Sequence, residues 1–139
     1  MIDDLATEHY SCRVKLVGHL DLLPPEVAGR MQRSADATTE KAGLTVNIAV
    51  GYGGRQEIVD AVRSLIAAEA DHVDSIDGLC ERVTVDSLGA HLYTSGQPDP
   101  DLVIRTSGEQ RLSGFLIWQA AYSDCLLYTS PSPRDGLLS

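Results

Sequence analysis

The sequence is poor in aromatic and basic residues, and each shortage excludes a class of protein. Aromatic residues make up only 5% of the 139 residues, and 11 lysines and arginines face 20 acidic residues, which gives a formal net charge of −9. A general nucleic-acid binder needs a basic face, so we expect no nucleic-acid partner. An acidic protein can still bind a phosphorylated ligand through a few arginines gathered in one place. Arginines that stand beside glycine are therefore the first candidates for a ligand site.

Cysteine and histidine are scattered, and long apolar runs are absent. Cys12, Cys80 and Cys125 are odd in number and form no CxxC pair, which predicts buried or free thiols in a reducing compartment. The four histidines are equally dispersed, so their spacing indicates no zinc site. No apolar run approaches the roughly 20 residues that span a bilayer, and no signal peptide precedes the domain. We therefore expect a cytoplasmic protein.

Three short apolar runs predict strands. They are Arg13–Val17, Leu44–Val50 and Asp101–Ile104, and the last two are nearly continuous in Val, Ile and Leu. Runs of that kind are typical of strands buried on both faces.

Helical patterns lie between the predicted strands. One opens at Pro24-Pro25 and is closed by Gly43, and another has apolar residues at helical spacing from Ile58 to Ile66. A shorter helix is predicted from Thr84, a candidate N-cap, to Leu92. Strands that alternate with helices predict right-handed crossovers, and so an α/β fold with a parallel sheet flanked by helices.

Glycine and a charged residue follow each predicted strand. The segments are Gly18–Asp21, Gly51–Arg55 and Arg105–Arg111. In a parallel sheet all strands end at one edge, and ligands bind in the crevice there. We therefore expect the three segments to converge on one site.

The segment after the third strand has the composition of a diphosphate site. Arg105-Thr-Ser-Gly-Glu-Gln-Arg-Leu-Ser-Gly114 brings two guanidinium groups, two serine hydroxyls and two glycines together. Guanidinium forks bind phosphate oxygens in bidentate fashion, and glycine lets backbone N–H groups approach an anion. The composition alone leaves open a solvated loop in which an arginine pairs with Glu109.

Other candidate segments carry weaker signals. Gly51–Arg55 precedes a helix and offers N–H groups to an anion, but it matches neither common nucleotide-binding motif, and a simple strand-to-helix turn explains it as well. Asp3-Asp4 has no second aspartate pair at helical spacing, which favours a solvated helix turn over a magnesium site.

Two blocks of the sequence resemble a known family. Pro100-Asp-Leu-Val-Ile-Arg-Thr-Ser-Gly-Glu-Gln-Arg-Leu-Ser-Gly-Phe-Leu-Ile-Trp-Gln-Ala-Ala-Tyr122 closely resembles the signature of cis-prenyltransferases, the undecaprenyl diphosphate synthase family. Leu44–Arg55 is similar to a second block of the same family. The sequence of the two blocks is most similar to that of actinobacterial members, including short-chain farnesyl and decaprenyl diphosphate synthases. The resemblance covers about residues 13 to 124.

The resemblance implies a set of site residues. Arg105, Arg111 and Ser113 correspond to residues that bind the head group of isopentenyl diphosphate, with Leu112 contributing through its backbone. Asp124 stands where the family usually has a glutamate that helps to hold Mg²⁺. Its carboxylate is shorter, but it keeps the oxygen ligand that Mg²⁺ prefers. Gln110 replaces a histidine found in some members, so no proton-transfer role is implied.

The resemblance also implies a reaction and partners. Isopentenyl diphosphate condenses head-to-tail with an allylic prenyl diphosphate, with Mg²⁺ as cofactor, to give a Z-polyprenyl diphosphate. The resemblance implies a homodimer. Peripheral membrane contact through the hydrophobic product is left open. Product chain length is not readable from these residues.

Two parts of the family pattern do not occur in the sequence. The H-x-x-M-D-G-N-G-R-W-A block, whose aspartate handles the allylic diphosphate, and a block resembling F-S-x-E-N-W are both absent. Residues 1–124 therefore predict a partial cis-prenyltransferase domain that lacks the allylic site and is inactive alone. A non-catalytic partner subunit of a prenyltransferase, or an unrelated phosphate-binding α/β module, remains as an alternative.

The last residues predict a non-native tail. Cys125-Leu-Leu-Tyr-Thr-Ser-Pro-Ser-Pro-Arg-Asp135 is one reading frame of the transposase adapter used in sequencing libraries, and the aromatic strand and W-P motif of the family do not follow Asp124. Its closely spaced prolines and serines also fit no packed element. We expect residues 125–139 to be adapter read-through.

Overall fold

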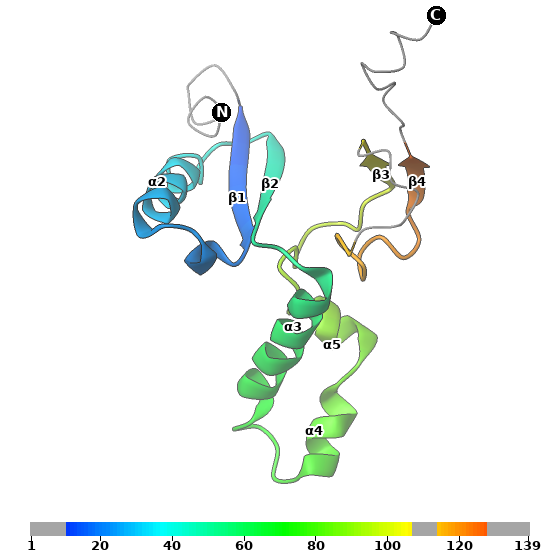
Figure 1. The fold of residues 1–139 in the computed structure, drawn as a ribbon. Helices are drawn as coiled ribbons and strands as arrows, with labels where there is room; N and C mark the ends of the chain where they lie inside the picture. Colours follow the sequence, from blue (N-terminus) through cyan, green and yellow to red (C-terminus); the bar gives the residue numbers. More distant parts are fainter. Residues whose placement is uncertain (1–10, 107–113, 128–139) are drawn as a thin grey trace, which may run out of the picture. The chain divides into compact units, whose positions relative to one another are not determined.

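The first two predicted strands pair with each other. In the computed structural model, which describes residues 11–106 and 114–127, β1 (Cys12–Gly18) runs parallel to β2 (Leu44–Val50), and the register joins Cys12 to Leu44 and Gly18 to Val50 (Figure 1). Both strands therefore end at the same edge. A parallel pair needs a crossover connection, and η1 (Leu20–Leu22) and α2 (Pro25–Asp36) provide it.

Helix α2 covers one face of this pair. It begins at Pro25, whose fixed φ and missing N–H suit the first turn of a helix. The core below it contains Cys12, Val14 and Ala35, with Leu16 and Ile48 among the partly buried residues packed against them.

A buried threonine ties the end of α2 to the sheet. The hydroxyl of Thr38 is fully buried; it accepts the N–H of Val14 at 2.8 Å and donates to the carbonyl of Ala35 at 2.7 Å. The helix ends at Asp36, before the predicted stop at Gly43.

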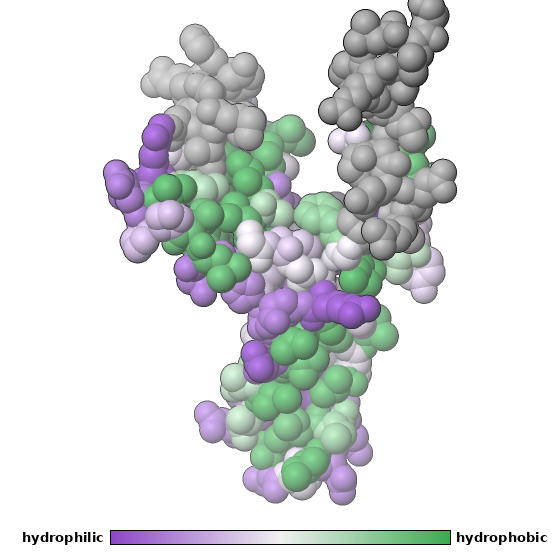
Figure 2. Space-filling view, in the orientation of Figure 1, coloured by the Kyte–Doolittle hydropathy of each residue, from purple (hydrophilic) through white to green (hydrophobic). Residues whose placement is uncertain are grey.

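Three helices follow β2. Helix α3 (Gly54–Glu69) buries Ala61 and Leu65, as its predicted apolar spacing requires. Helix α5 (Val85–Gly89) begins at the predicted N-cap, and Thr84 and Ser87 form a reciprocal capping box. Between them lies α4 (Ile76–Arg82), capped by Ser75, which the sequence patterns did not predict. Figure 2 shows apolar surface over this helical part, where Val59, Ile66, Ile76, Val83 and Val85 are exposed.

The chain forms two compact units, Met1–Ser95 and Gly96–Ser139. In the second, β3 (Leu102–Arg105) runs parallel to β4 (Asp124–Leu127). The predicted boundary between Asp124 and Cys125 falls inside β4, and the adapter origin of the tail stays a prediction.

The predicted parallel α/β arrangement is confirmed, but one expectation about burial is wrong. The second and third apolar runs were expected to be buried on both faces, whereas Leu44 is 71% exposed and Ile104 is 59% exposed. The described residues place each run in a sheet of only two strands, so neither run has the neighbours that bury an inner strand. Within residues 11–106 and 114–127, no helix is both long and apolar enough to cross a membrane.

Candidate functional site

The ends of β1 and β2 meet through a glycine. Gly18 has φ of +103°, and a Cβ at this position would lie 2.3 Å from the carbonyl oxygen of Val50. Only glycine permits both the backbone conformation and the close approach. The next residue, His19, donates its N–H to the same oxygen at 2.9 Å. Two of the three predicted glycine segments are thus brought together at one edge.

The first turns of α3 present two carboxylates to this edge. Glu57 is only 1% exposed; it accepts the backbone N–H of Tyr93 at 2.9 Å and the hydroxyl of Tyr52. A buried carboxylate is costly unless its oxygens are hydrogen-bonded, and these donors meet that requirement. Asp60 lies nearly one turn further along the helix.

Asp60 contacts three polar side chains through its carboxylate oxygens. Its Oδ2 accepts the hydroxyl of Tyr93 at 2.6 Å and lies 3.0 Å from Nε2 of His19, while its Oδ1 accepts from Gln56 at 2.9 Å. The hydrogen bonds from Tyr93 and Gln56 lower the pKa of Asp60 below its ordinary value of 3.8. We call His19, Tyr52, Glu57, Asp60 and Tyr93 the edge network.

Tyr93 is the centre of the edge network. Burial, together with the hydrogen bond to Asp60, raises the pKa of its hydroxyl above the ordinary value of 10.0. The centroid of its ring lies 6.1 Å from that of Tyr52 and 6.4 Å from that of His19, and both pairs are edge to face. At neutral pH the hydroxyl is therefore a fixed donor to a fixed carboxylate.

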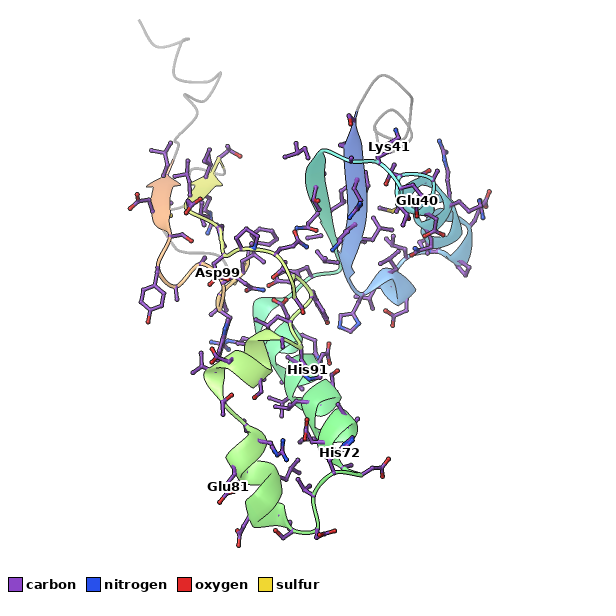
Figure 3. All side chains as sticks on the ribbon, turned by 180° about the vertical axis from the view of Figure 1, so that it is seen from behind. Glu40, Lys41, His72, Glu81, His91 and Asp99 are labelled. Carbon is purple, nitrogen blue, oxygen red and sulfur yellow. The ribbon has the colours of Figure 1, made fainter. Side chains whose placement is uncertain are left out.

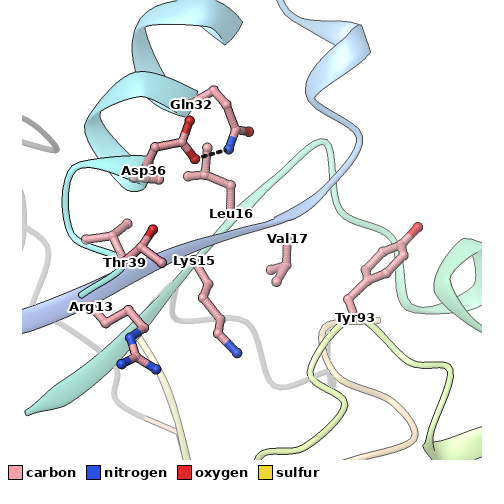
Figure 4. A pocket seen from close by; sticks show the side chains of 10 residues that line it. Arg13, Lys15, Leu16, Val17, Gln32, Asp36, Thr39 and Tyr93 are labelled. Carbon is pink, nitrogen blue, oxygen red and sulfur yellow. Dashed lines mark hydrogen bonds between the residues drawn. The ribbon is translucent and has the colours of Figure 1, made fainter. Parts of the chain in front are cut away.

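A cavity of about 330 Å³ runs along β1 beside this network. Figure 4 shows Arg13, Lys15 and Val17 on one side of β1, and Gln32 and Asp36 on the other. The Nε atom of Arg13 is buried and has no hydrogen-bond partner within the described residues. None of the predicted site residues lines this cavity.

The structure places only part of the predicted isopentenyl diphosphate site. Arg105 is half-buried and is the last residue of β3, whereas the sequence predicted that the strand ends at Ile104 and that Arg105 follows it. Arg111, Leu112 and Ser113 lie outside the described residues. Arg105 belongs to the second unit, so its predicted convergence with the edge of β1 and β2 stays a prediction.

Asp124 and Arg105 lie at opposite ends of the β3–β4 pair. Asp124 is the first residue of β4 and pairs with Leu102, whereas Arg105 pairs with Leu127. The two positions are three residue steps apart along the strands, or about 10 Å. The backbone N–H of Asp124 donates to the carbonyl of Asp101 at 3.0 Å, so two exposed aspartates are neighbours at this end.

Asp124 offers one exposed carboxylate, which is the kind of oxygen ligand that Mg²⁺ prefers. Mg²⁺ usually keeps several waters and binds through one or two carboxylates plus phosphate oxygens. Among the residues that the structure describes, no group of three or more potential ligands is assembled. His72 follows α3 and hydrogen-bonds the carbonyl of Ala68, while His91 follows α5 and hydrogen-bonds Ser64. Figure 3 labels the two histidines at separate places.

His19 and Tyr52 lie in two of the segments predicted to converge, but sequence patterns missed Glu57, Asp60 and Tyr93, which are far from His19 along the chain. His19 and Asp60 are separated by 41 positions, and Tyr93 and Asp60 by 33. One signal was present: Glu57 and Asp60 share a face of the predicted helix beside an apolar stripe.

Comparisons with known proteins identify the same family that the sequence blocks resemble. The Prenyltransf family model, described as "Putative undecaprenyl diphosphate synthase", matches residues 2–133. Isoprenyl transferase 1 of Corynebacterium diphtheriae is 62% identical over 124 residues, which are 89% of this chain and 47% of the relative. The (2Z,6E)-farnesyl diphosphate synthase of Mycolicibacterium smegmatis is 54% identical over 89% of this chain and 48% of the relative.

A solved structure agrees as well. Lavandulyl diphosphate synthase from Lavandula x intermedia, crystallised with dimethylallyl diphosphate, is similar with a TM-score of 0.76 and 30% identity, over 91% of this chain and 52% of that chain. This chain thus spans about half the length of the relatives that it matches. The model match, the identities and the shared fold confirm the predicted family, and the chain belongs to the cis-prenyltransferase family.

Proposed function

We propose that this chain is the part of a cis-prenyltransferase that binds isopentenyl diphosphate for condensation with an allylic prenyl diphosphate. The observation that carries the proposal is the segment Arg105–Gly114, which begins at the last residue of β3 and combines two arginines with glycine and serine. The names of the relatives, which are isoprenyl transferases and Z-farnesyl diphosphate synthases, support the same reaction.

The proposed site works by positioning and charge. Arg105 and Arg111 hold the diphosphate through bidentate hydrogen bonds, Ser113 adds a neutral donor, and Leu112 adds its backbone N–H. Each hydrogen bond to the charged group contributes roughly 1.5–3 kcal/mol. With the head group fixed, the double bond of isopentenyl diphosphate is held for reaction.

In the proposed condensation, no covalent bond to the enzyme forms. The double bond of isopentenyl diphosphate attacks the allylic carbon, the allylic carbon–oxygen bond breaks, and pyrophosphate leaves with the electron pair. Loss of a proton then gives the new Z double bond. Holding the two substrates in reactive geometry supplies most of the rate.

Asp124 is the proposed metal-binding residue. Asp124 would hold Mg²⁺ through its carboxylate, and the ion would supply charge neutralisation for a leaving diphosphate. The exposed carboxylate of Asp124, with Asp101 beside it, leaves room for the water and phosphate ligands that Mg²⁺ keeps.

We further propose that the 139-residue chain binds isopentenyl diphosphate but does not turn it over. The family blocks that handle the allylic diphosphate do not occur in its sequence. In the complete enzyme we expect a cytoplasmic homodimer that touches the membrane only through its product.

The test uses the chain and a hybrid enzyme. In the hybrid, the matched region of the Corynebacterium diphtheriae relative is replaced by the corresponding residues of this chain. We expect the chain alone to bind isopentenyl diphosphate in calorimetry without product, and the hybrid to make Z-prenyl diphosphate. A hybrid without prenyl transfer, at a wild-type level of folded protein, would refute the proposal.

The non-catalytic alternative has its own outcome. A chain that stimulates a complete homologue on mixing, while its matched region fails in the hybrid, would be an accessory subunit. The absent allylic blocks are the observation that favours this alternative.

We also propose that residues 125–139 are encoded by a sequencing adapter. The support is the match of Cys125–Asp135 to one adapter reading frame. Amplifying the genomic DNA across the codon of Asp124 tests this, and finding the same codons in the genome would refute it.

A further inference from the structure

The outer edge of β1, on the side away from β2, is already occupied. The N–H of Val14 donates to the hydroxyl of Thr38 at 2.8 Å, and this threonine is fully buried. Because strand N–H groups lie in the plane of their sheet, this bond uses a donor that a further strand would need. Arg13, Lys15 and Asp36 also line the cavity beside β1, and charged side chains keep a sheet edge from pairing. The sheet is therefore closed on the side of β1.

The outer edge of β2 has no such protection. Val50 directs its carbonyl toward β1, where it accepts the N–H of His19 at 2.9 Å. The backbone groups of successive strand residues point to opposite sides, so Thr45 and Ala49 direct theirs to the outer edge. Within the described residues this sheet ends at β2, a strand that contains neither a charge nor a proline. An edge strand without these features is open to a further strand.

The side chains of β2 also suit an inner position. Leucine, valine, isoleucine and alanine make up most of the strand, as in strands that have a neighbour on each side. Leu44 is nevertheless 71% exposed, and Ala49 is exposed as well. An unpaired edge and exposed apolar side chains thus occur on the same strand. A third strand along this edge would satisfy both.

Similar proteins have the additional chain that such a strand needs. The relatives from Corynebacterium diphtheriae and Mycolicibacterium smegmatis are matched over 47% and 48% of their lengths, and lavandulyl diphosphate synthase over 52%. About half of each therefore lies outside the match. A second copy of this chain is a poorer occupant, because two chains with a formal charge of −9 repel each other.

We propose that the outer edge of β2 is a docking site for an extended segment from the half of the family fold that this chain does not match, and that the segment docks as a separate chain. Ladder hydrogen bonds to Thr45 and Ala49 hold it, and its apolar side chains cover Leu44. The inference rests on family membership and not on the proposed function. Both described strand pairs are parallel, so we expect the added strand to run parallel to β2.

The first test is assembly from two chains. The 139-residue chain is coexpressed without a tag, together with each unmatched segment of the Corynebacterium diphtheriae relative as a separate tagged chain. We expect one segment to retain the 139-residue chain on affinity purification, in a one-to-one complex. Ala49→Pro removes the N–H at the outer edge and no bond to β1, and should lower the recovered complex by about tenfold or more. Ala49→Val keeps this N–H and is the matched control.

The second test locates the contact without a substitution. Amide hydrogen exchange at Thr45 and Ala49 should be slower by about tenfold or more in the complex than in the dilute 139-residue chain. The amide of Ile48 points to β1, so its exchange is the internal reference and should change far less. This readout does not depend on the folding of the Ala49→Pro variant.

Three outcomes would overturn the inference. They are the failure of every segment to retain the chain, equal recovery of the Ala49→Pro and Ala49→Val variants, and unchanged exchange at Thr45 and Ala49 in the complex.

The exchange data also separate other occupants of the edge. Slow exchange of both amides in the dilute chain alone would show that this chain fills its own edge, and slow exchange only in the concentrated chain would identify a second copy; either result would overturn the assigned partner. Protected amides in a complex that transfers no prenyl group would leave the inference intact and count against the proposed function.

Discussion

Guanidinium groups meet a diphosphate with two parallel hydrogen bonds, and this geometry decides what single substitutions should do. Arg105 is fixed at the end of β3, so its fork has a defined starting point. An ammonium group is a point charge and does not reproduce the bidentate contact. Loss of either arginine should therefore weaken the hold on isopentenyl diphosphate and lower kcat/KM for this substrate.

Arg111→Ala in the hybrid enzyme should lower kcat/KM for isopentenyl diphosphate by roughly 10²–10³, or about 2–4 kcal/mol of transition-state stabilisation. Steady-state kinetics measures it. Arg82→Ala is the matched control, because Arg82 lies on α4 in a loose ion pair with Glu69 at 3.8 Å. An unchanged kcat/KM would refute the assignment of Arg111.

Asp124→Ala should raise the Mg²⁺ concentration needed for half-maximal activity of the hybrid by about tenfold, since a charged ligand is lost. Asp124→Glu should keep or improve the metal response, because glutamate is the usual family residue. Activity measured against Mg²⁺ concentration gives both values. An identical response in all three proteins would exclude Asp124 as a ligand.

The sequence predicted roles that depend on neighbouring residues, such as helix capping. It did not predict contacts between residues that are far apart along the chain. Thr84 was predicted as an N-cap because capping depends on the next three positions alone. The contact of His19 with Asp60 depends on how β1 and α3 come together, which no local spacing encodes.

At the scale of elements, short apolar runs and helical spacing predicted most of the arrangement. The run at Leu44–Val50 is β2 with the same bounds, because β-branched residues between glycine-rich turns leave little choice. Helix α4 was missed, since its seven residues carry too little apolar pattern. Burial was overestimated, because it depends on neighbouring strands rather than on the run itself.

Thr84→Ala should destabilise the helical part by about 1 kcal/mol, because the capping box with Ser87 loses its acceptor and an N–H of α5 is left without its partner. Urea denaturation of the hybrid enzyme measures the loss. Thr39→Ala serves as control, since Thr39 is an exposed threonine outside any capping box. Equal losses in both variants would contradict the capping role.

Asp60 should make stability depend on acid pH. Its folded pKa lies below 3.8, so its contribution is fully present above that value and is lost as the pH falls through the folded pKa. The difference in melting temperature between the hybrid and its Asp60→Asn variant should therefore be largest near neutral pH and shrink as the pH falls below 3.8. A difference that grows in acid would reverse the assigned sign.

On the scale of the whole molecule, the 139-residue chain exposes surface that a complete enzyme of the family would be expected to cover. Ile76 is 80% exposed, Leu44 is 71% exposed, and both described sheets have only two strands. Such surfaces favour association.

We expect the isolated chain to be poorly soluble, or to show a broad thermal transition and weak near-UV circular dichroism. The hybrid enzyme should unfold cooperatively, because we expect the remaining segments of the relative to cover these surfaces. A sharp transition and strong near-UV signal in the isolated chain would contradict this prediction.

The pairing of β4 with β3 has a consequence for protein engineering. Ladder bonds are made by main-chain atoms, which are the same in every peptide, so a stretch beginning at Asp124 can dock whether it was inherited or acquired by accident. The flank of β3 would then be a general receptor for extended peptides. A tag fused after Asp124 should contain a proline near its start, because proline prevents the tag from pairing with β3 as an additional strand.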